Sequence, residues 1–143
     1  MMSIINVVID TNVLISALKS KQGASYKLLL ALADDLFLPN ISVPLFLEYE
    51  SVAKRAGLLD KLEEKDINSI LNYFLAKSSV RKIFYLWRPY LKDSKDDLVL
   101  EVAVESRSEY IITFNKKDFV GCNKFGIKIV TPLEFIKARG ILG

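Results

Sequence analysis

The sequence predicts an α/β fold in three layers, with helices on both faces of a parallel sheet of four or five strands. Short apolar runs rich in β-branched residues alternate along the chain with longer segments of helical periodicity. The run IINVVI at residues 4–9 is almost continuously apolar, as expected of a strand that is buried on both faces. With 143 residues, 51% of them hydrophobic and 26% charged, the chain is expected to form a single domain over residues 1–143.

The first third of the chain predicts a strand, two helices and a second strand. Asp10 ends the first strand, and residues 13–18 follow as a short helix. Ser25 can cap a helix that runs to about residue 34, with leucines on its inner side. Residues 36–38 are expected to form a short strand, closed by the turn residues Pro39 and Asn40.

The middle of the chain predicts two further helices and a weaker strand. Ser42 and Pro44 favour the start of a helix over residues 43–55, because proline is tolerated in the first helical turn, and Gly57 ends it. Apolar residues at helical spacing predict a helix over residues 60–76. Residues 80–84 are expected to form a strand, and residues 87–95 a loop.

The last third predicts strands and helices in alternation. Ser94 is expected to open a helix over residues 95–107. A compact strand at residues 110–113 leads into a polar turn at residues 115–119, and a last strand follows at residues 127–130. Pro132 is expected at the first position of a terminal helix.

The composition excludes several classes of site. The chain has no histidine, which excludes Ser-His-Asp and Cys-His triads and zinc sites with histidine ligands. Its single cysteine, Cys122, cannot form an internal disulfide and fits a reducing compartment. A net charge of +3 is too weak to indicate a nucleic-acid partner alone. No export signal or membrane-spanning run is recognisable, so we expect a cytoplasmic protein without a membrane partner.

Two predicted strand ends place acid or amide groups at the same edge of the sheet. Asp10 directly follows the first strand, and Asn115 and Asp118 follow the strand at residues 110–113. In open parallel sheets, functional groups collect at the carboxyl ends of the strands. A simpler interpretation is also open: Asp10 could only cap the helix at residues 13–18, and Asn115 and Asp118 could only cap a turn.

Glu48 is a third candidate, because it lies within an apolar stripe. Leu45 precedes it by three residues and Val52 follows it by four, so all three share one face of the predicted helix. A carboxylate that faces a core needs a cation, a metal or a cleft. The alternative is that Glu48 lies at the exposed rim or forms a salt bridge.

Three acids lie close together at residues 93–97. Ser94 and Asp97 have capping-box spacing, which predicts that Asp97 caps the helix and faces solvent. Asp96 shares a face with Val99, Leu100 and Ala103, and is therefore the residue expected at a functional site. The role of Asp93 remains open between these two.

Convergent carboxylates need a counter-charge, because like charges raise each other's pKa. Mg²⁺ and Mn²⁺ prefer oxygen ligands and are commonly held by carboxylates. A water bound to such a metal has a lowered pKa and can attack a phosphodiester, with no histidine required. The sequence therefore favours a site for a hard divalent cation formed by Asp10, Glu48, Asp96 and Asp118.

The chain resembles the PIN-domain ribonucleases over nearly its whole length. Four motifs carry the resemblance in order: VIDTNVL at 8–14, SVPLFLEY at 42–49, DSKDD at 93–97 and YIITFNKKDF at 110–119. The tail at residues 125–135 is similar to one subgroup, the toxin components of toxin–antitoxin pairs (VapC-like ribonucleases).

The resemblance implies an endoribonuclease that depends on Mg²⁺ or Mn²⁺ and cuts single-stranded or exposed RNA. Its acidic quartet, which serves as catalytic residues and metal ligands, matches Asp10, Glu48, Asp96 and Asp118. Its supporting polar positions match Thr11, Asn12, Thr113 and Asn115. Asn115 stands where many members carry Asp, which puts a second metal site in doubt. The partners it implies are RNA, a cognate antitoxin protein and a second copy in a homodimer.

Other functions stay open at this point. The chain could be a PIN-like module that binds RNA or a protein without cutting, or another metal-dependent phosphohydrolase such as a DNA nuclease. A nucleotide-binding domain is disfavoured, because Asp-Thr-Asn replaces the glycine-rich turn after the first strand. Candidate phosphate-binding residues near the acids are Arg88, Lys116 and Lys117, and Tyr90 and Phe114 are candidates for stacking on bases.

Overall fold

The chain forms a five-stranded parallel sheet with strand order β3-β2-β1-β4-β5. The computed structural model describes residues 4–55, 59, 61–84 and 90–141. The strands are β1 (Ile5–Ile9), β2 (Phe37–Ile41), β3 (Ser79–Val80), β4 (Tyr110–Ile112) and β5 (Lys128–Val130). The α-helices are α1 (Thr11–Lys19), α2 (Ala24–Ala31), α3 (Val43–Ala53), α4 (Glu64–Lys77), α5 (Ser94–Ser106) and α6 (Pro132–Arg139). The 3₁₀ helices are η1 (Leu32–Asp34), η2 (Lys116–Phe119) and η3 (Cys122–Phe125).

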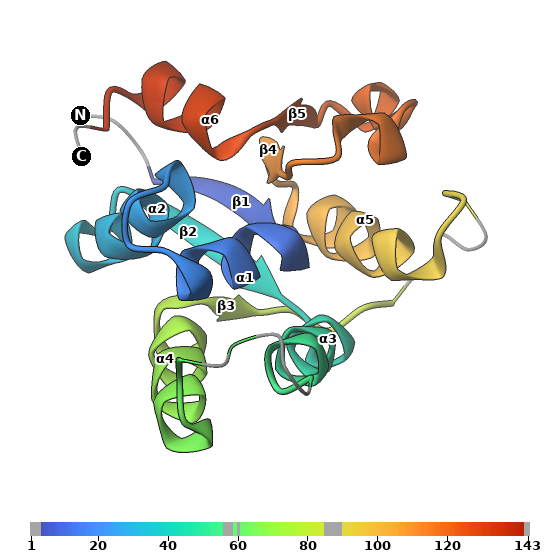
Figure 1. The fold of residues 1–143 in the computed structure, drawn as a ribbon. Helices are drawn as coiled ribbons and strands as arrows, with labels where there is room; N and C mark the ends of the chain where they lie inside the picture. The colour runs from blue at the N-terminus through green and yellow to red at the C-terminus, as the bar shows by residue number, and fades with distance from the viewer. Residues whose placement is uncertain (1–3, 56–58, 60, 85–89, 142–143) are drawn as a thin grey trace.

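Helices cover both faces of this sheet, so the predicted three-layer α/β fold is confirmed (Figure 1). The connections from β1 to β2 and from β2 to β3 step in one direction, whereas the connection from β3 to β4 steps back across β2 and β1. Right-handed crossovers therefore place α5 on the face opposite α1 to α4. α5 packs against β1, β2 and β4, while α2 contacts both α1 and α6.

The central strand β1 supplies the middle of the core. Val7 and Val8 are fully buried, as expected of a strand covered on both faces. Phe135 of α6 packs edge-to-face against Phe37 of β2 and Tyr110 of β4, with ring centroids 5.3 and 5.2 Å apart. These aromatic contacts fasten the C-terminal helix to strands on both sides of β1.

β2 is longer than predicted, because Pro39 and Asn40 lie inside the strand instead of ending it. Pro39 pairs with Val7 of β1, while β3 pairs with β2 only from Asn40 onwards. The side-chain amide of Asn40 is fully buried and donates to the carbonyl of Val7 (3.3 Å). Its oxygen accepts from Nε of Arg81 (2.9 Å), directly after β3. Asn40 therefore acts as a connection between strands.

Three other predicted boundaries are wrong by a few residues. α2 begins after Gly23, so Ser25 is a buried residue inside the helix and not its cap. α4 begins at Glu64, four residues after the predicted start at residue 60, because a capping box of Glu63 and Asp66 sets it. The strand predicted at residues 80–84 is only Ser79–Val80. Gly57, predicted to end α3, and residues 87–89 of the predicted loop lie outside the described residues.

None of the helices in the described part of the chain has the length and apolar character that crossing a bilayer requires.

Replacing Asn40 by alanine is expected to lower the free energy of unfolding by about 1–3 kcal/mol, because its partners in β1, in β2 and directly after β3 each lose a hydrogen bond. The exposed Asn72 of α4 offers a control, and Asn72→Ala should change stability by less than about 0.5 kcal/mol. Urea unfolding of the two variants measures the difference. Equal stability would contradict a structural role for Asn40.

Candidate functional site

β1 ends at Asp10, whose carboxylate is held by two hydrogen bonds. Oδ1 accepts from the backbone N–H of Thr11 (2.9 Å), and Oδ2 accepts from the hydroxyl of Thr113 (2.7 Å), directly after β4. Only 8% of Asp10 is exposed. Burial raises the pKa of Asp10; the two hydrogen bonds oppose this shift, and the charges of Asp118 and Asp93 add to it. Asp10 is therefore the N-cap of α1, as the simpler interpretation had it, and also a buried carboxylate at a sheet edge.

The position of Glu48 depends on its neighbour Tyr49. The Tyr49 side chain is fully buried, packs edge-to-face on Phe74 of α4, and donates its hydroxyl to the carbonyl of Ile9 at the end of β1. Burial holds the pKa of this hydroxyl well above its usual value, so it stays a donor. Since Glu48 precedes Tyr49, this hydrogen bond fixes Glu48 near the end of β1. Oε1 of Glu48 lies 3.7 Å from Nζ of Lys95, which is the salt bridge that the alternative interpretation expected.

Asp93 and Asp96 lie at the start of α5. Asp93 is the N-cap and accepts from the backbone N–H of Lys95 (2.9 Å), so the helix begins one residue earlier than predicted. Asp96 is partly exposed. Burial raises the pKa of Asp96 to about 7, and the charges of Asp10, Asp118, Asp93 and Asp97 add to this shift. Four nearby carboxylates thus make it difficult to ionise Asp96.

The prediction that Asp97 caps the helix and faces solvent is wrong. Asp97 is only 1% exposed, and its Oδ1 accepts from the backbone N–H of Leu91 (2.8 Å). The face of α5 that carries Asp97 is buried too, as the 2% exposure of Glu101 four residues later shows, and there Asp97 ties the preceding segment to α5. Capping falls to Asp93, which the sequence left without an assigned role.

The second group at the edge of the sheet follows β4. Thr113 is fully buried, donates to Asp10, and accepts from the backbone N–H of Asn115 (3.0 Å). The predicted turn forms as η2, in which the N–H of Asp118 donates to the carbonyl of Asn115 (3.0 Å). Phe119 is buried and anchors this turn, while Asn115 and Asp118 are exposed. Thr113 thus connects this loop directly to Asp10.

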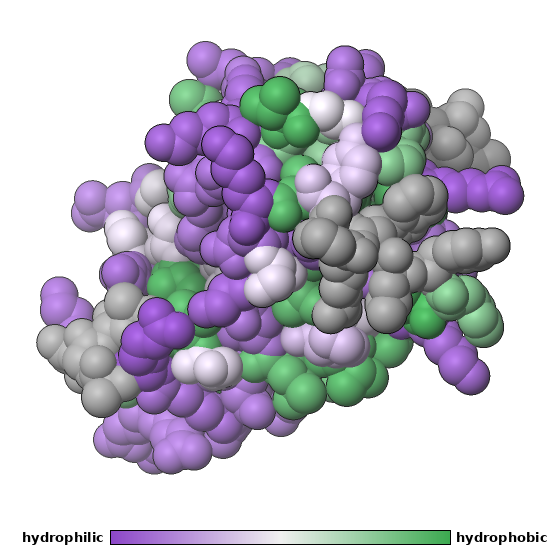
Figure 2. Space-filling view, turned by 90° about the vertical axis from the view of Figure 1, so that its right-hand side faces the viewer, coloured by the Kyte–Doolittle hydropathy of each residue, from purple (hydrophilic) through white to green (hydrophobic). Residues whose placement is uncertain are grey.

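All four predicted acids line one cleft of about 570 Å³, which we call the acidic cleft. It lies where β1, β2 and β4 end, between α1, α3, the start of α5 and η2. Its lining residues are Asp10, Thr11, Asn12, Ile15, Ser16, Lys19, Glu48, Val52, Arg55, Asp93, Lys95, Asp96, Phe114, Asn115 and Asp118. Strands β1 and β2 end toward the right-hand side of Figure 1, and Figure 2 shows that side as largely hydrophilic, with separate hydrophobic patches.

A second cleft of about 660 Å³ shares Asp93, Asp96 and Asp118 with the acidic cleft. We call it the side cleft. Its other lining residues are Tyr90, Leu91, Lys92, Lys117 and Val120. The shared acids therefore stand where two clefts meet.

The donor set of the acidic cleft fits a hard divalent cation. Burial and neighbouring carboxylates raise the pKa of Asp10 and of Asp96, and the side-chain oxygen of Asn12, which lines the cleft, is buried without a hydrogen-bond partner. Oxygen donors of this kind are those that Mg²⁺ and Mn²⁺ prefer. Within residues 4–55, 59, 61–84 and 90–141, no three acidic or cysteine side chains are positioned to coordinate one metal ion together. A cation would therefore have to draw the carboxylates together or keep several waters.

The supporting polar residues predicted from the sequence lie at the site, whereas only one of the predicted cations in the described residues lines a cleft. Thr11, Asn12 and Asn115 line the acidic cleft, and Thr113 bonds to Asp10. Lys117 lines the side cleft, whereas Lys116 forms an ion pair with Glu134 (3.0 Å). Arg88 lies outside the described residues.

Of the two aromatic residues proposed to stack on bases, only Phe114 lines the acidic cleft, and it is 47% exposed. The Tyr90 ring lines the side cleft and already has Nζ of Lys124 above it, 4.6 Å from its centroid. A base could therefore stack on Phe114 more readily than on Tyr90.

Besides Lys95, which pairs with Glu48, the acidic cleft is lined by two cations that the sequence reasoning missed, Lys19 and Arg55. Helical spacing could have found them. Lys19 lies seven residues after Asn12 on α1, and Arg55 lies seven residues after Glu48, just beyond α3. Residues seven apart share one face of a helix, so each cation extends the face that begins with a site residue.

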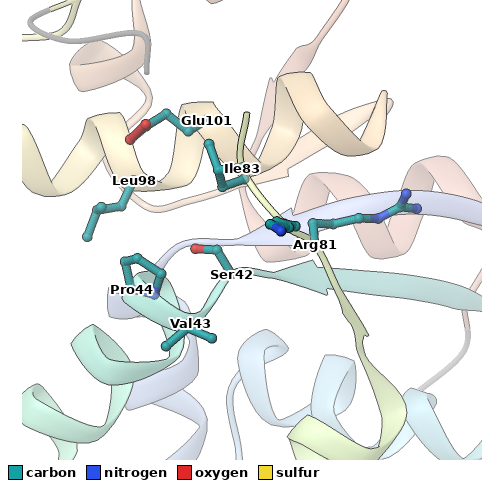
Figure 3. A pocket seen from close by; sticks show the side chains of 8 residues that line it. Ser42, Val43, Pro44, Arg81, Ile83, Leu98 and Glu101 are labelled. Carbon is teal, nitrogen blue, oxygen red and sulfur yellow. The ribbon is translucent and has the colours of Figure 1, made fainter. Parts of the chain in front are cut away.

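A smaller pocket of about 300 Å³ lies away from the four acids (Figure 3). Pro44 at the start of α3 and Leu98 of α5 lie across it from one another, with Ile83 beside them. Its walls are mainly apolar, although Arg81, Lys82 and Glu101 also line it. It offers no group of acids.

Comparison with protein-family models finds a match to the model described as PIN domain, over residues 6–117. The matched segment contains Asp10, Glu48 and Asp96 and ends one residue before Asp118. No curated protein matches the chain.

Replacing Asp96 by asparagine should stabilise the cation-free protein at pH 8 and leave its stability at pH 4 unchanged. The pKa of Asp96 is about 7 in the folded chain, above its usual value of 3.8. Between these values the folded chain holds a proton that the unfolded chain has released, so stability falls as pH rises. Because asparagine does not ionise, the variant does not lose this stability as the pH rises. Melting temperatures in EDTA across this pH range measure it, and an equal gain at both pH values would contradict the electrostatic cause.

Replacing Asp97 by alanine should lower the free energy of unfolding by about 1–3 kcal/mol, because the N–H of Leu91 loses its buried acceptor. Asp97→Asn keeps an acceptor oxygen and should retain most of the stability. Chemical unfolding compares the two variants. If both lose the same amount, the hydrogen bond to Leu91 is not what Asp97 contributes.

Proposed function

We propose that this chain, which belongs to the PIN-domain family, is an endoribonuclease that depends on Mg²⁺ or Mn²⁺. PIN domains are generally nucleases and typically use divalent metal ions. The observation that carries the finer proposal is that Asp10, Glu48, Asp96 and Asp118, from four separate elements, line one open cleft. Such a concentration of carboxylates is unfavourable unless a cation is bound there.

The residues of the cleft have distinct roles in this proposal. Asp10, fixed by Thr11 and Thr113, supplies a carboxylate whose position does not depend on a bound ligand. Asp96, Asp118 and Glu48 supply the other oxygens that can move toward a cation. A bound Mg²⁺ or Mn²⁺ supplies a water of lowered pKa and compensates the charge of the phosphate under attack.

The family resemblance of the sequence motifs supports RNA as the substrate. The cleft is open and has cations at its edge, as binding a flexible phosphate backbone requires. The exposed Phe114 ring at the same cleft offers a surface on which a base can stack. These features favour a single strand over a duplex.

The toxin role of the proposal rests on the motif at residues 125–135, which here forms β5 and the capping box of α6. Under this proposal the protein has a cognate antitoxin and acts on cytoplasmic RNA, as a monomer or as a homodimer. Growth arrest on expression, relieved by a small protein encoded beside it, would support the role. Expression without any effect on growth would contradict it.

The wild-type protein should cleave a labelled single-stranded RNA with Mn²⁺ or Mg²⁺ and lose this activity in EDTA. Asp10→Asn should reduce cleavage by at least about 100-fold while the fold survives, because asparagine can still cap α1. Asp34→Asn, at an exposed position in η1, is the matched control and should cleave like wild type. A DNA strand of the same sequence is assayed alongside the RNA under the same conditions.

Three outcomes would contradict the proposal. Binding without cleavage in any metal would indicate a non-catalytic module. Cleavage of the DNA alone would indicate a DNA nuclease. Full activity in EDTA, or in Asp10→Asn, would refute the metal-dependent mechanism.

A further inference from the structure

The acidic cleft extends away from the acids along the line where α1 and α3 pack together. On α1 it is lined by Asn12, Ser16 and Lys19, at intervals of four and three residues. From α3 it is lined by Glu48, Val52 and Arg55, at the same intervals. The two helices therefore present matching faces, each with a site residue at its start and a cation at its end.

The part of the cleft between these ends is partly apolar. Ile15 of α1 is 5% exposed, and Val52 of α3 is partly buried. Ser16 adds a hydroxyl to the same wall. An apolar wall with a hydroxyl beside it suits the flat face of a base or a ribose better than it suits a second metal ion.

The two cations at the far end are exposed and have no ion-pair partner among the described residues. Lys54, next to Arg55 in sequence, differs: it pairs with Glu50 (3.4 Å) and Glu64 (3.7 Å) and does not line the cleft. Of the two adjacent cations, Lys54 is therefore held by acids away from the cleft, whereas Arg55 lines the cleft without an ion-pair partner among the described residues.

We propose that the α1–α3 groove, lined by Ile15, Ser16, Lys19, Val52 and Arg55, binds a nucleotide next to the cleavage site. Lys19 and Arg55 hold its backbone phosphate, and Ile15 and Val52 contact its base or ribose. Seven helical residues span about 10 Å along α1, from Asn12 to Lys19, and this length separates the phosphate at Lys19 from the one at the acids. The proposal rests on the nuclease function above and adds the direction in which the strand leaves the site.

A helix C-terminus favours a nearby cation, and Lys19 lies in the last turn of α1. That effect alone would make Lys19 a contributor to stability without any contact to substrate. The test therefore needs a readout that stability does not change, and the length of the substrate provides it. A groove that binds an additional nucleotide should distinguish long substrates from short ones.

The experiment compares single-stranded RNA oligonucleotides that carry one cleavable bond and are extended stepwise on either side. For wild type, kcat/KM should rise about tenfold or more once the RNA is long enough to reach the groove. This rise should occur when the RNA is extended on one side of the cleavable bond and not on the other. Lys19→Ala/Arg55→Ala should lose this rise, so that its kcat/KM no longer increases with the length of the RNA. Lys27→Ala/Lys54→Ala, with the same change in charge, should keep the full rise.

Binding of the longer RNA to the Asp10→Asn protein provides a second measurement. Loss of the one phosphate contact that Lys19 and Arg55 share should reduce the slope of log K against log salt by about 0.7, whereas the control pair should leave the slope nearly unchanged. Melting temperatures of all variants show whether lost helix stability accounts for any difference.

Failures of the two proposals give different results. No cleavage and no binding of any RNA would contradict the nuclease function itself. RNA cleavage whose length dependence is the same in both charge-matched pairs would leave the nuclease and overturn the groove, as would binding of an acidic peptide there without any effect on RNA.

Discussion

The carboxylate of Asp10 is the constraint on which the rest of the site depends. It is buried at the end of the central strand, where it caps α1 through Thr11 and accepts a hydrogen bond from Thr113. The second bond joins two neighbouring strand ends, and through Asn115 it reaches the turn that carries Asp118. One buried side chain therefore fixes the start of a helix and the loop after β4 together.

The other side of the cleft is fixed by Tyr49, whose hydroxyl bonds to the carbonyl of Ile9, directly before Asp10. Because Tyr49 and Glu48 are adjacent, α3 cannot move without moving a site carboxylate. Burial, and then the surrounding charges, oppose ionisation of Asp10 and Asp96. The fold thus maintains an arrangement that is electrostatically unfavourable without a cation, as is common where pKa values are shifted for chemistry.

Much of this arrangement could be predicted from the sequence, because it follows from strand ends and helical spacing. The run at residues 4–9 identified the central strand, and Asp10 and Asp118 followed from the rule that functional groups collect at the carboxyl edge. Glu48 followed from its place in an apolar stripe. The N-cap of α5 at Asp93 was not predictable, since Asp93 and Ser94 are both good caps and adjacent in sequence. That difference gave the cap to Asp93, and the burial of the α5 face that carries Asp97 and Glu101 reversed the expectation that Asp97 faces solvent.

Tertiary contacts determined the features that the sequence analysis missed. Asn40 was interpreted as a turn residue, yet it bonds to Val7 and Arg81, which are distant in sequence. Lys19 and Arg55 stand at the ends of helices, where a cation ordinarily indicates only a favourable helix terminus. The packing of α1 against α3 brings both cations to the same cleft, and this packing cannot be inferred from either helix alone.

Binding of Mn²⁺, followed by the electron paramagnetic resonance signal of the free ion, tests the central claim most directly. The account predicts that wild-type protein binds Mn²⁺, and that Asp10→Asn and Asp118→Asn each weaken binding by at least about tenfold. Asp34→Asn, outside both clefts, should bind like wild type. Wild-type protein that binds no Mn²⁺ at millimolar concentration, or cleft variants that bind as wild type does, would contradict the account.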